Sequence, residues 1–171
     1  MPSMGLMTTL SLVESGLALM LWVVAFSTRG WSVWSAGPID VSIGLFTYDA
    51  AGTVGDNPTS ENPFLTTIAL ETNGGVLMFA AVGLLAMSVF KKNKLSSVVF
   101  MCAAFLSGIF IFAAIGYYKV NSSATINNQK VTGLSIGYSW YLAMISGVLI
   151  WSAPGALFAA MRRGEISFGG Y

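Results

Sequence analysis

Residues 137–165 read GYSWYLAMISGVLIWSAPGALFAAMRRGE. This stretch is mostly apolar over about the 20 residues that a membrane-spanning helix needs, and two arginines follow the apolar run. Three more apolar stretches of similar length precede it. The predicted spans cover residues 6–27, 68–90, 96–117 and 139–161. The sequence therefore predicts an all-α membrane protein in which residues 1–171 form one domain, a bundle of four transmembrane helices.

The composition supports a membrane protein and argues against an enzyme. Hydrophobic residues make up 55% of the chain and charged residues only 9%, against about 25% charged residues in a soluble domain. There is no His and only one Cys, Cys102, which excludes His-based metal and haem sites, Ser-His and Cys-His pairs, and an intrachain disulfide. The net charge of +1 gives no basic surface for nucleic acid. We expect no catalytic residues, no cofactor and no metal site.

The lysines and arginines predict the orientation of the bundle. Short loops rich in Lys and Arg stay cytoplasmic, and here such residues follow the second and fourth spans directly. They are Lys91, Lys92, Lys94, Arg162 and Arg163. Both termini are then cytoplasmic, and the connections at residues 28–67 and 118–138 are extracellular. We expect a multi-pass protein of the plasma membrane, with the lipid bilayer as its first partner.

Both outer connections contain strand-like segments. Val41, Ile43 and Leu45 alternate with small or polar residues, which is the period-2 pattern of a half-buried strand. Residues 120–131 read more weakly as a short strand or hairpin, whereas residues 51–62 are rich in turn formers and predict a loop. We therefore expect a small extracellular β-sheet built from both outer loops.

Two dipeptides mark expected boundaries within these connections. Asn127-Asn128 is a candidate turn between two short strands. Asn62-Pro63 is a typical helix start, with Asn as the cap and Pro at the first helical position. The second helix should therefore begin near Phe64, outside the bilayer.

Glu14 is the ionisable residue that lies well inside a predicted span. A charge at that depth costs at least about 2.5 kcal/mol, so the side chain should be protonated, face the bundle or pair with a polar group. The favoured interpretation is a carboxyl satisfied by neighbouring hydroxyl groups, those of Thr8, Thr9, Ser11 and Ser15. The alternatives are a proton or ion site and a contact with a partner protein. Glu71 and Asn73 lie nearer the outer end of the second span and are interpreted as caps.

The outer loops carry the remaining polar features. The first loop has four acidic residues, Asp40, Asp49, Asp56 and Glu61. Their spacing matches no catalytic pattern, so we interpret them as a solvated acidic loop, whose charge would favour cations if it lined a paracellular path. Asn121-Ser122-Ser123 is an N-glycosylation sequon so close to the end of a helix that access to it is poor.

The last two spans contain a recognisable pattern of residues. The fourth span reads Y-S-x-x-L-A, then a Gly and a basic end closing in Arg and Glu, at Tyr138, Ser139, Leu142, Ala143, Gly155, Arg162 and Glu165. The third span contributes Leu106, Gly108, Ala114, Tyr118 and Val120. In these positions both spans resemble those of the peripheral myelin protein and epithelial membrane protein group. This resemblance implies the claudin superfamily, with four spans, cytoplasmic termini, a long first outer loop and a short second one.

The first loop matches the signature of that superfamily, W…G-L-W…C…C, only in part. Trp31 corresponds to the leading Trp, with Arg29 nearby, and Gly44-Leu45-Phe46 resembles G-L-W with Phe at the last position. Both cysteines of the signature are absent, so the chain lacks the disulfide that the resemblance would imply.

Three functions remain open. The first is a claudin-like tetraspan protein of cell junctions that organises membranes or cell adhesion. Its candidate contacts with itself or with junction proteins are Trp31, Trp34, Leu45, Phe46 and the loop at residues 51–62. The second is an auxiliary subunit that docks onto an ion channel or receptor, as the stargazin-like gamma subunits do. The third is a small transporter that uses Glu14, for which no second intramembrane charge is found.

Overall fold

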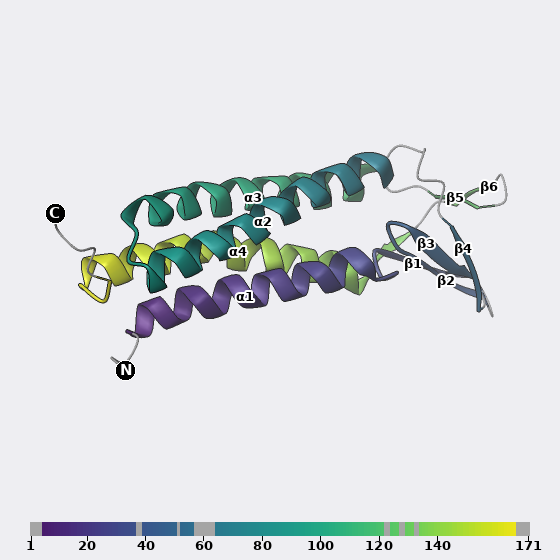
Figure 1. Cartoon of the computed structure of the whole chain (residues 1–171). Helices are drawn as coiled ribbons and strands as arrows, with labels where there is room; N and C mark the ends of the chain where they lie inside the picture. Colours follow the sequence, from purple (N-terminus) through teal and green to yellow (C-terminus); the bar gives the residue numbers. More distant parts are fainter. Residues whose placement is uncertain are drawn as a thin grey trace.

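The computed structural model describes residues 5–36, 39–50, 52–56, 64–121, 124–126, 129–131 and 134–166. A small sheet lies at one end of four long helices (Figure 1). The helices are α1 (Leu6–Ser27), α2 (Phe64–Phe90), α3 (Lys94–Asn121) and α4 (Tyr138–Arg162). Each is long and apolar enough to cross a membrane. The expected architecture of four apolar helices with an added sheet is confirmed.

The helices extend beyond the predicted spans, chiefly at the end that carries the sheet. α2 begins at Phe64, where the sequence predicts the helix start, and α3 continues to Asn121 instead of ending near residue 117. Hydropathy marks only the apolar part of a helix, whereas backbone hydrogen bonds continue it through polar residues. Residues 118–121 therefore belong to α3 and not to the second connection. Asn62-Pro63 lies outside the described residues.

The sheet is antiparallel, with the strand order β4-β3-β2-β1-β7. Its strands are β1 (Ser32–Ala36), β2 (Ile39–Ile43), β3 (Thr47–Ala50), β4 (Thr53–Asp56) and β7 (Ser135–Ile136). The first four strands come from the connection between α1 and α2. β7 precedes α4 and pairs with β1, with Ile136 opposite Ser32. The prediction that both connections contribute to one sheet is confirmed.

Two details of the connections differ from the expectation. Thr53–Asp56 forms β4, although the sequence predicts a loop there, because pairing with β3 satisfies its backbone groups despite a composition typical of turns. In the second connection, β5 (Ala124–Ile126) and β6 (Gln129–Val131) form a separate hairpin. The candidate turn Asn127-Asn128 lies outside the described residues.

Small residues allow the helices to approach closely. Each helix carries at least one fully buried alanine, among them Ala18 on α1, Ala81 on α2, Ala104 on α3 and Ala153 on α4. Three serine hydroxyls also donate to backbone carbonyl oxygens of a neighbouring helix: Ser11 to Ala153 at 2.9 Å, Ser146 to Ala18 at 2.8 Å and Ser107 to Gly74 at 2.7 Å. These bonds join α1 to α4 and α2 to α3, so the bundle consists of two closely packed helix pairs.

The buried hydrophobic residues form two clusters. One runs along the bundle and includes Trp22, Met78, Phe100, Ile150 and Leu157. The other lies at the sheet end and includes Trp31, Ile43, Leu45, Tyr118 and Trp140. We call the second the junction cluster. It contains residues of the sheet and of the helices, so it fixes the sheet to the bundle.

The start of α1 lies at the end of the bundle away from the sheet (Figure 1). There Glu165, which follows α4, completes the first turn of α1. The residue before this helix, Gly5, has no side chain to cap it. The Glu165 carboxylate accepts hydrogen bonds from the backbone N–H of Thr8 at 3.0 Å and of Met7 at 3.4 Å. These bonds, that from Thr8 above all, hold the pKa of Glu165 below its usual value. The segment after α4 is thereby tied to the beginning of α1.

Candidate functional site

Trp31 lies where the sheet meets the helices. Its side chain is fully buried, and its indole N–H donates to the carbonyl oxygen of Ala25 in α1 at 2.8 Å. Its ring packs edge-on against Tyr118 of α3, with 5.1 Å between the ring centroids. Its backbone N–H donates to Ile43 and its carbonyl oxygen accepts from Gly137, both at 3.0 Å. Trp31 therefore joins the sheet to α1, to α3 and to the N-cap residue of α4, and it does not form the surface contact that the sequence predicts.

The polar atoms of the other junction aromatics are also hydrogen-bonded. The Tyr118 hydroxyl donates to the Ser32 hydroxyl oxygen at 3.0 Å, and the indole N–H of Trp140 donates to the carbonyl oxygen of Ile115, also at 3.0 Å. A buried aromatic with its polar atom paired adds a directional bond to a large apolar contact. The chain's one cysteine, Cys102, is exposed on α3, so this junction holds the sheet without a disulfide.

The Gly44-Leu45-Phe46 triplet has mainly a structural role. A Cβ atom on Gly44 would lie 2.8 Å from the Arg29 Cα atom and 2.9 Å from the Thr28 carbonyl oxygen, so a side chain does not fit there. Leu45 is buried in the junction cluster and cannot serve as a surface contact. Phe46 is 38% exposed and packs edge-on against Phe26 of α1, with ring centroids 5.1 Å apart. Of the triplet, only Phe46 reaches the surface with a large side chain.

The two faces of the sheet have different roles. Ser32, Val41 and Ile43 belong to the face that packs on the bundle, since all three are buried. The alternate residues share the opposite face, where Ser35 pairs with Asp40 and Ser42 pairs with both Val33 and Asp49. A hollow of about 610 Å³, which we call the sheet hollow, is lined mainly by residues of this face, and Trp34 and Val41 of the bundle face also contribute to it. Its lining includes Val33, Trp34, Ser35, Asp40, Ser42 and Asp49.

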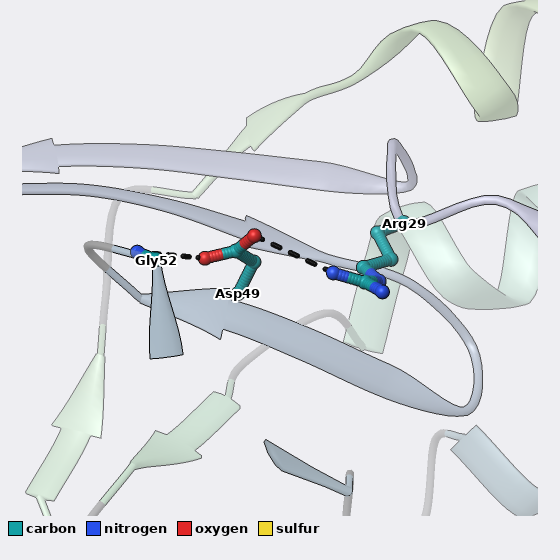
Figure 2. A network of polar contacts seen from close by, with 3 residues as sticks. All are labelled: Arg29, Asp49 and Gly52. Atoms are coloured by element: carbon teal, nitrogen blue, oxygen red, sulfur yellow. Dashed lines mark hydrogen bonds and ion pairs between the residues drawn. The ribbon is translucent and has the colours of Figure 1, made fainter. Parts of the chain in front are cut away.

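Arg29 and Asp49 form an ion pair beside the sheet hollow, shown in Figure 2. The guanidinium lies 3.4 Å from one Asp49 oxygen, while the other oxygen accepts the backbone N–H of Gly52 at 3.0 Å. Gly52 has a φ of +84°, which suits glycine in the turn between β3 and β4. Asp40 is exposed and forms no ion pair with any described residue. The hollow therefore has one carboxylate that Arg29 does not neutralise.

The other polar candidates do not gather at this site. Asp56 ends β4 opposite Thr47 in the strand register, and Glu61 lies outside the described residues. Asn121 is the exposed last residue of α3, and its side-chain amide donates to the carbonyl oxygen of Tyr117 at 2.9 Å. The other two sequon positions, Ser122 and Ser123, lie outside the described residues.

The hydroxyl groups around Glu14 do not satisfy its carboxyl. One oxygen, Oε2, is buried without a hydrogen-bond partner. The four hydroxyls point elsewhere: Thr8 donates to Glu165, Thr9 to the carbonyl oxygen of Gly5, Ser11 to that of Ala153, and Ser15 has no partner. The favoured interpretation of Glu14 as a carboxyl satisfied by its neighbours is therefore wrong. Helix geometry explains two of these contacts, since Thr9 reaches the carbonyl oxygen four residues earlier and Ser11 reaches one on the adjacent helix α4.

Glu71 connects two helices and is not a surface cap. It is fully buried, and its Oε2 accepts the indole N–H of Trp22 in α1 at 2.8 Å. Its other oxygen and the Thr67 hydroxyl are buried without hydrogen-bond partners. Asn73 is exposed and donates to the carbonyl oxygen of Ala69 within α2. Gly75, one helical turn after Glu71, is the feature of the sequence that could have indicated the contact between Glu71 and Trp22. A glycine at that position leaves the space that the Trp22 ring fills.

Among the described residues, no group of three or more His, Cys, Asp or Glu side chains is placed to hold a metal ion. No protein-family model matches the chain, and no curated protein matches it in sequence. Function is therefore inferred from the junction cluster, the sheet hollow and the helix surfaces.

Proposed function

We propose that this chain is a non-enzymatic, claudin-like four-span protein that organises cell contacts through its sheet. The observation that carries this proposal is a five-stranded sheet, drawn from both connections and fixed to the bundle by Trp31 and Tyr118. This arrangement combines a membrane anchor with a rigid surface beyond it. The partial signature of Trp31 and Gly44-Leu45-Phe46 supports the same family, since these residues form that junction.

The distribution of cations supports an extracellular position of the sheet. Lys91 and Lys92 lie in the turn between α2 and α3, and Arg162 and Arg163 lie at the end of α4, all exposed and away from the sheet (Figure 1). Basic residues beside spans favour the cytoplasmic side. With that end inside the cell, the sheet projects outside, where it can meet a second membrane or a neighbouring protein.

The sheet hollow is the proposed contact surface. A binding surface is more effective when it is held rigid before binding, as the junction cluster holds this sheet. The hollow combines apolar groups of Val33 and Trp34 with polar groups of Ser35 and Ser42, a mixture typical of protein interfaces. The unneutralised Asp40 carboxylate favours a partner with a basic or N–H-bearing side chain at that point.

The test measures enrichment at contacts between cells that express the protein with two different fluorescent tags. Ser42 lines the hollow, so Ser42→Arg should fill it and abolish enrichment while the protein still reaches the surface. The matched control is Thr53→Arg, because Thr53 is exposed on β4 and its register partner, Ala50, belongs to the other face of the sheet. The control should retain enrichment.

Two results would contradict the proposal. One is unchanged enrichment of the Ser42→Arg variant at normal surface levels. The other is the absence of any enrichment of the unmodified protein together with stoichiometric co-purification of a pore-forming or receptor subunit after mild detergent extraction. The second result would favour the auxiliary-subunit function instead.

A further inference from the structure

The end of the bundle away from the sheet carries five exposed cations. Lys91 and Lys92 lie in the turn after α2, and Lys94 is the first residue of α3. Arg162 ends α4 and Arg163 follows it. Both segments lie at the end opposite the sheet (Figure 1), and we call these five residues the basic end. Since the helices are long and apolar enough to cross a membrane, the basic end lies at the level of the phospholipid headgroups.

The described part of the chain does not neutralise the basic end. The ion pair among the described residues joins Arg29 to Asp49, at the sheet end. Outside the helices, Glu165 is the one described acidic residue near the basic end, and its carboxylate is hydrogen-bonded to the start of α1. Arg163 helps to lower the pKa of Glu165 but does not form an ion pair with it. The basic end therefore carries an excess of positive charge.

The sheet end of the bundle does not share this excess. Arg29 is paired with Asp49, and the same sheet carries two further carboxylates, those of Asp40 and Asp56. Lys119, in the last turn of α3, lies over the ring of Trp140, with its Nζ atom 5.9 Å from the ring centroid. The cations of the sheet end thus have partners or nearby acidic residues within the chain, whereas those of the basic end face the headgroup region.

Two lysines of the basic end occupy positions that suit other residues better. Lys92 has a φ of +52°, and among the described residues it is the one non-glycine residue with a positive φ. Lys94 begins α3, where the helix dipole disfavours a positive charge. An anion beside this turn would interact favourably with both lysines and with the positive end of the α3 dipole. The local structure therefore favours a negatively charged group next to the turn.

We propose that the basic end binds the headgroups of anionic phospholipids, so that the protein gathers these lipids around one end of its bundle. Lysine ammonium groups donate to phosphate oxygens, and an arginine guanidinium can donate two parallel hydrogen bonds to one phosphate. The Arg162 guanidinium lies 4.9 Å from the ring centroid of Phe158, which is 48% exposed, so it stays beside the helix surface that faces lipid. Clusters of Lys and Arg directly beyond a span are attracted to anionic lipid surfaces.

This binding is independent of the contact that the sheet hollow is proposed to make, because the two surfaces lie at opposite ends of the molecule (Figure 1). In the orientation proposed above, the bound lipids belong to the cytoplasmic leaflet. Failure of the cell-contact test would leave the lipid preference in place, and loss of the lipid preference would leave the cell contact in place.

Electron spin resonance of labelled lipids tests the preference. The full-length protein is reconstituted into phosphatidylcholine vesicles that contain a small fraction of phosphatidylserine or phosphatidylcholine with a spin label on the acyl chain. Lipids that contact the protein are immobilised, so the spectra give the relative association constant of the two lipids. We expect phosphatidylserine to be preferred by at least about threefold, and the preference should fall as NaCl screens the charges. Equal association of the two lipids, or a preference that NaCl does not lower, would overturn the proposal.

Substitution of the lysines locates the binding surface. A variant with Lys91→Gln, Lys92→Gln and Lys94→Gln should lose most of the preference for phosphatidylserine. Lys119→Gln is the matched control, because Lys119 is an exposed lysine near the other end of α3, and it should keep the preference. An unchanged preference in the triple variant, or an equal loss in the control, would overturn the proposal. The orientation of the reconstituted protein does not affect the result, since both leaflets have the same composition. If the triple variant fails to fold, the salt dependence of the unmodified protein decides.

Discussion

The junction cluster and the middle of the bundle differ in how many of their buried polar atoms have hydrogen-bond partners. In the junction, Trp31, Tyr118 and Trp140 each have their polar atom hydrogen-bonded within the chain. In the bundle, Glu14 and Glu71 each keep a buried oxygen without a partner. Buried polar groups are nearly always paired in native proteins, with protein or with water. The difference teaches that the junction pairs the polar atoms of its aromatics within the chain, whereas the bundle buries carboxyl oxygens of Glu14 and Glu71 that the described residues do not pair.

A complete junction also accounts for a stable sheet without the disulfide of the claudin signature. A disulfide typically stabilises a fold by about 2–4 kcal/mol. Truncating a buried aromatic side chain costs about 3–5 kcal/mol, so one well-packed tryptophan has a comparable effect. Trp31 combines that packing with a hydrogen bond to α1 and backbone bonds to β2 and to the start of α4.

The largest expected effect comes from Trp31→Ala, which removes the centre of the junction. We expect a loss of about 3–5 kcal/mol in the free energy of unfolding, because a large buried side chain leaves a cavity. Denaturant titration of the detergent-purified protein measures it. Trp34→Ala is the control, since Trp34 is only partly buried on β1. Equal losses for the two variants would show that Trp31 has no special role.

Gly44→Ala should have the next largest effect. The added methyl group would approach the backbone of Arg29 and Thr28 to less than 3 Å, and backbone atoms cannot move aside as a flexible side chain can. We expect a loss of about 1–3 kcal/mol in the same titration. Gly16→Ala is the matched control, because a Cβ atom on Gly16 meets nothing within 4 Å, and it should be neutral or slightly stabilising. A neutral Gly44→Ala would contradict the packing described for the junction.

Tyr118→Phe separates the hydrogen bond of the junction from its packing. The change removes the hydroxyl that donates to Ser32 at 3.0 Å and keeps the ring that packs on Trp31. We expect a loss of about 1 kcal/mol. Tyr141→Phe, at a side chain that is 49% exposed, should change stability little. A loss as large as that of Trp31→Ala would mean that hydrogen bonding, and not packing, dominates the junction.

Glu165→Gln should have the smallest effect, and the size of that effect depends on pH. The pKa of Glu165 is lowered in the folded protein by hydrogen bonds from Thr8 and Met7, so its carboxylate stabilises the fold above its ordinary pKa. That contribution is lost as the pH falls through the lowered value. The unmodified protein should therefore be more stable than the Gln variant at neutral pH, and the difference should vanish in acid. A difference that persists at about pH 3 would contradict the carboxylate cap.

The sequence predicts the helices better than it predicts their polar contacts. Apolar runs indicate the bundle, and the period-2 alternation of Val41 and Ile43 indicates β2, because each pattern reports burial along one element; Leu45, which continues the alternation, lies after the end of β2. The sequence does not predict β4, because the strand character of this segment comes from its pairing with β3 and not from its own residues. The partners of Glu14 and Glu71 could not be predicted, since a hydrogen bond between helices depends on how the helices pack.

Amide hydrogen exchange of the purified protein in lipid tests most directly the claim that the junction fixes the sheet to the bundle. The decisive amides are those of Trp31, Gly137 and Ser139, which donate to the carbonyl oxygens of Ile43, Trp31 and Gly30. We predict that these amides exchange as slowly as those of the buried helix turns and far more slowly than those of the β5–β6 hairpin, a two-stranded element of low intrinsic stability. Exchange at the junction as fast as in that hairpin would contradict the account.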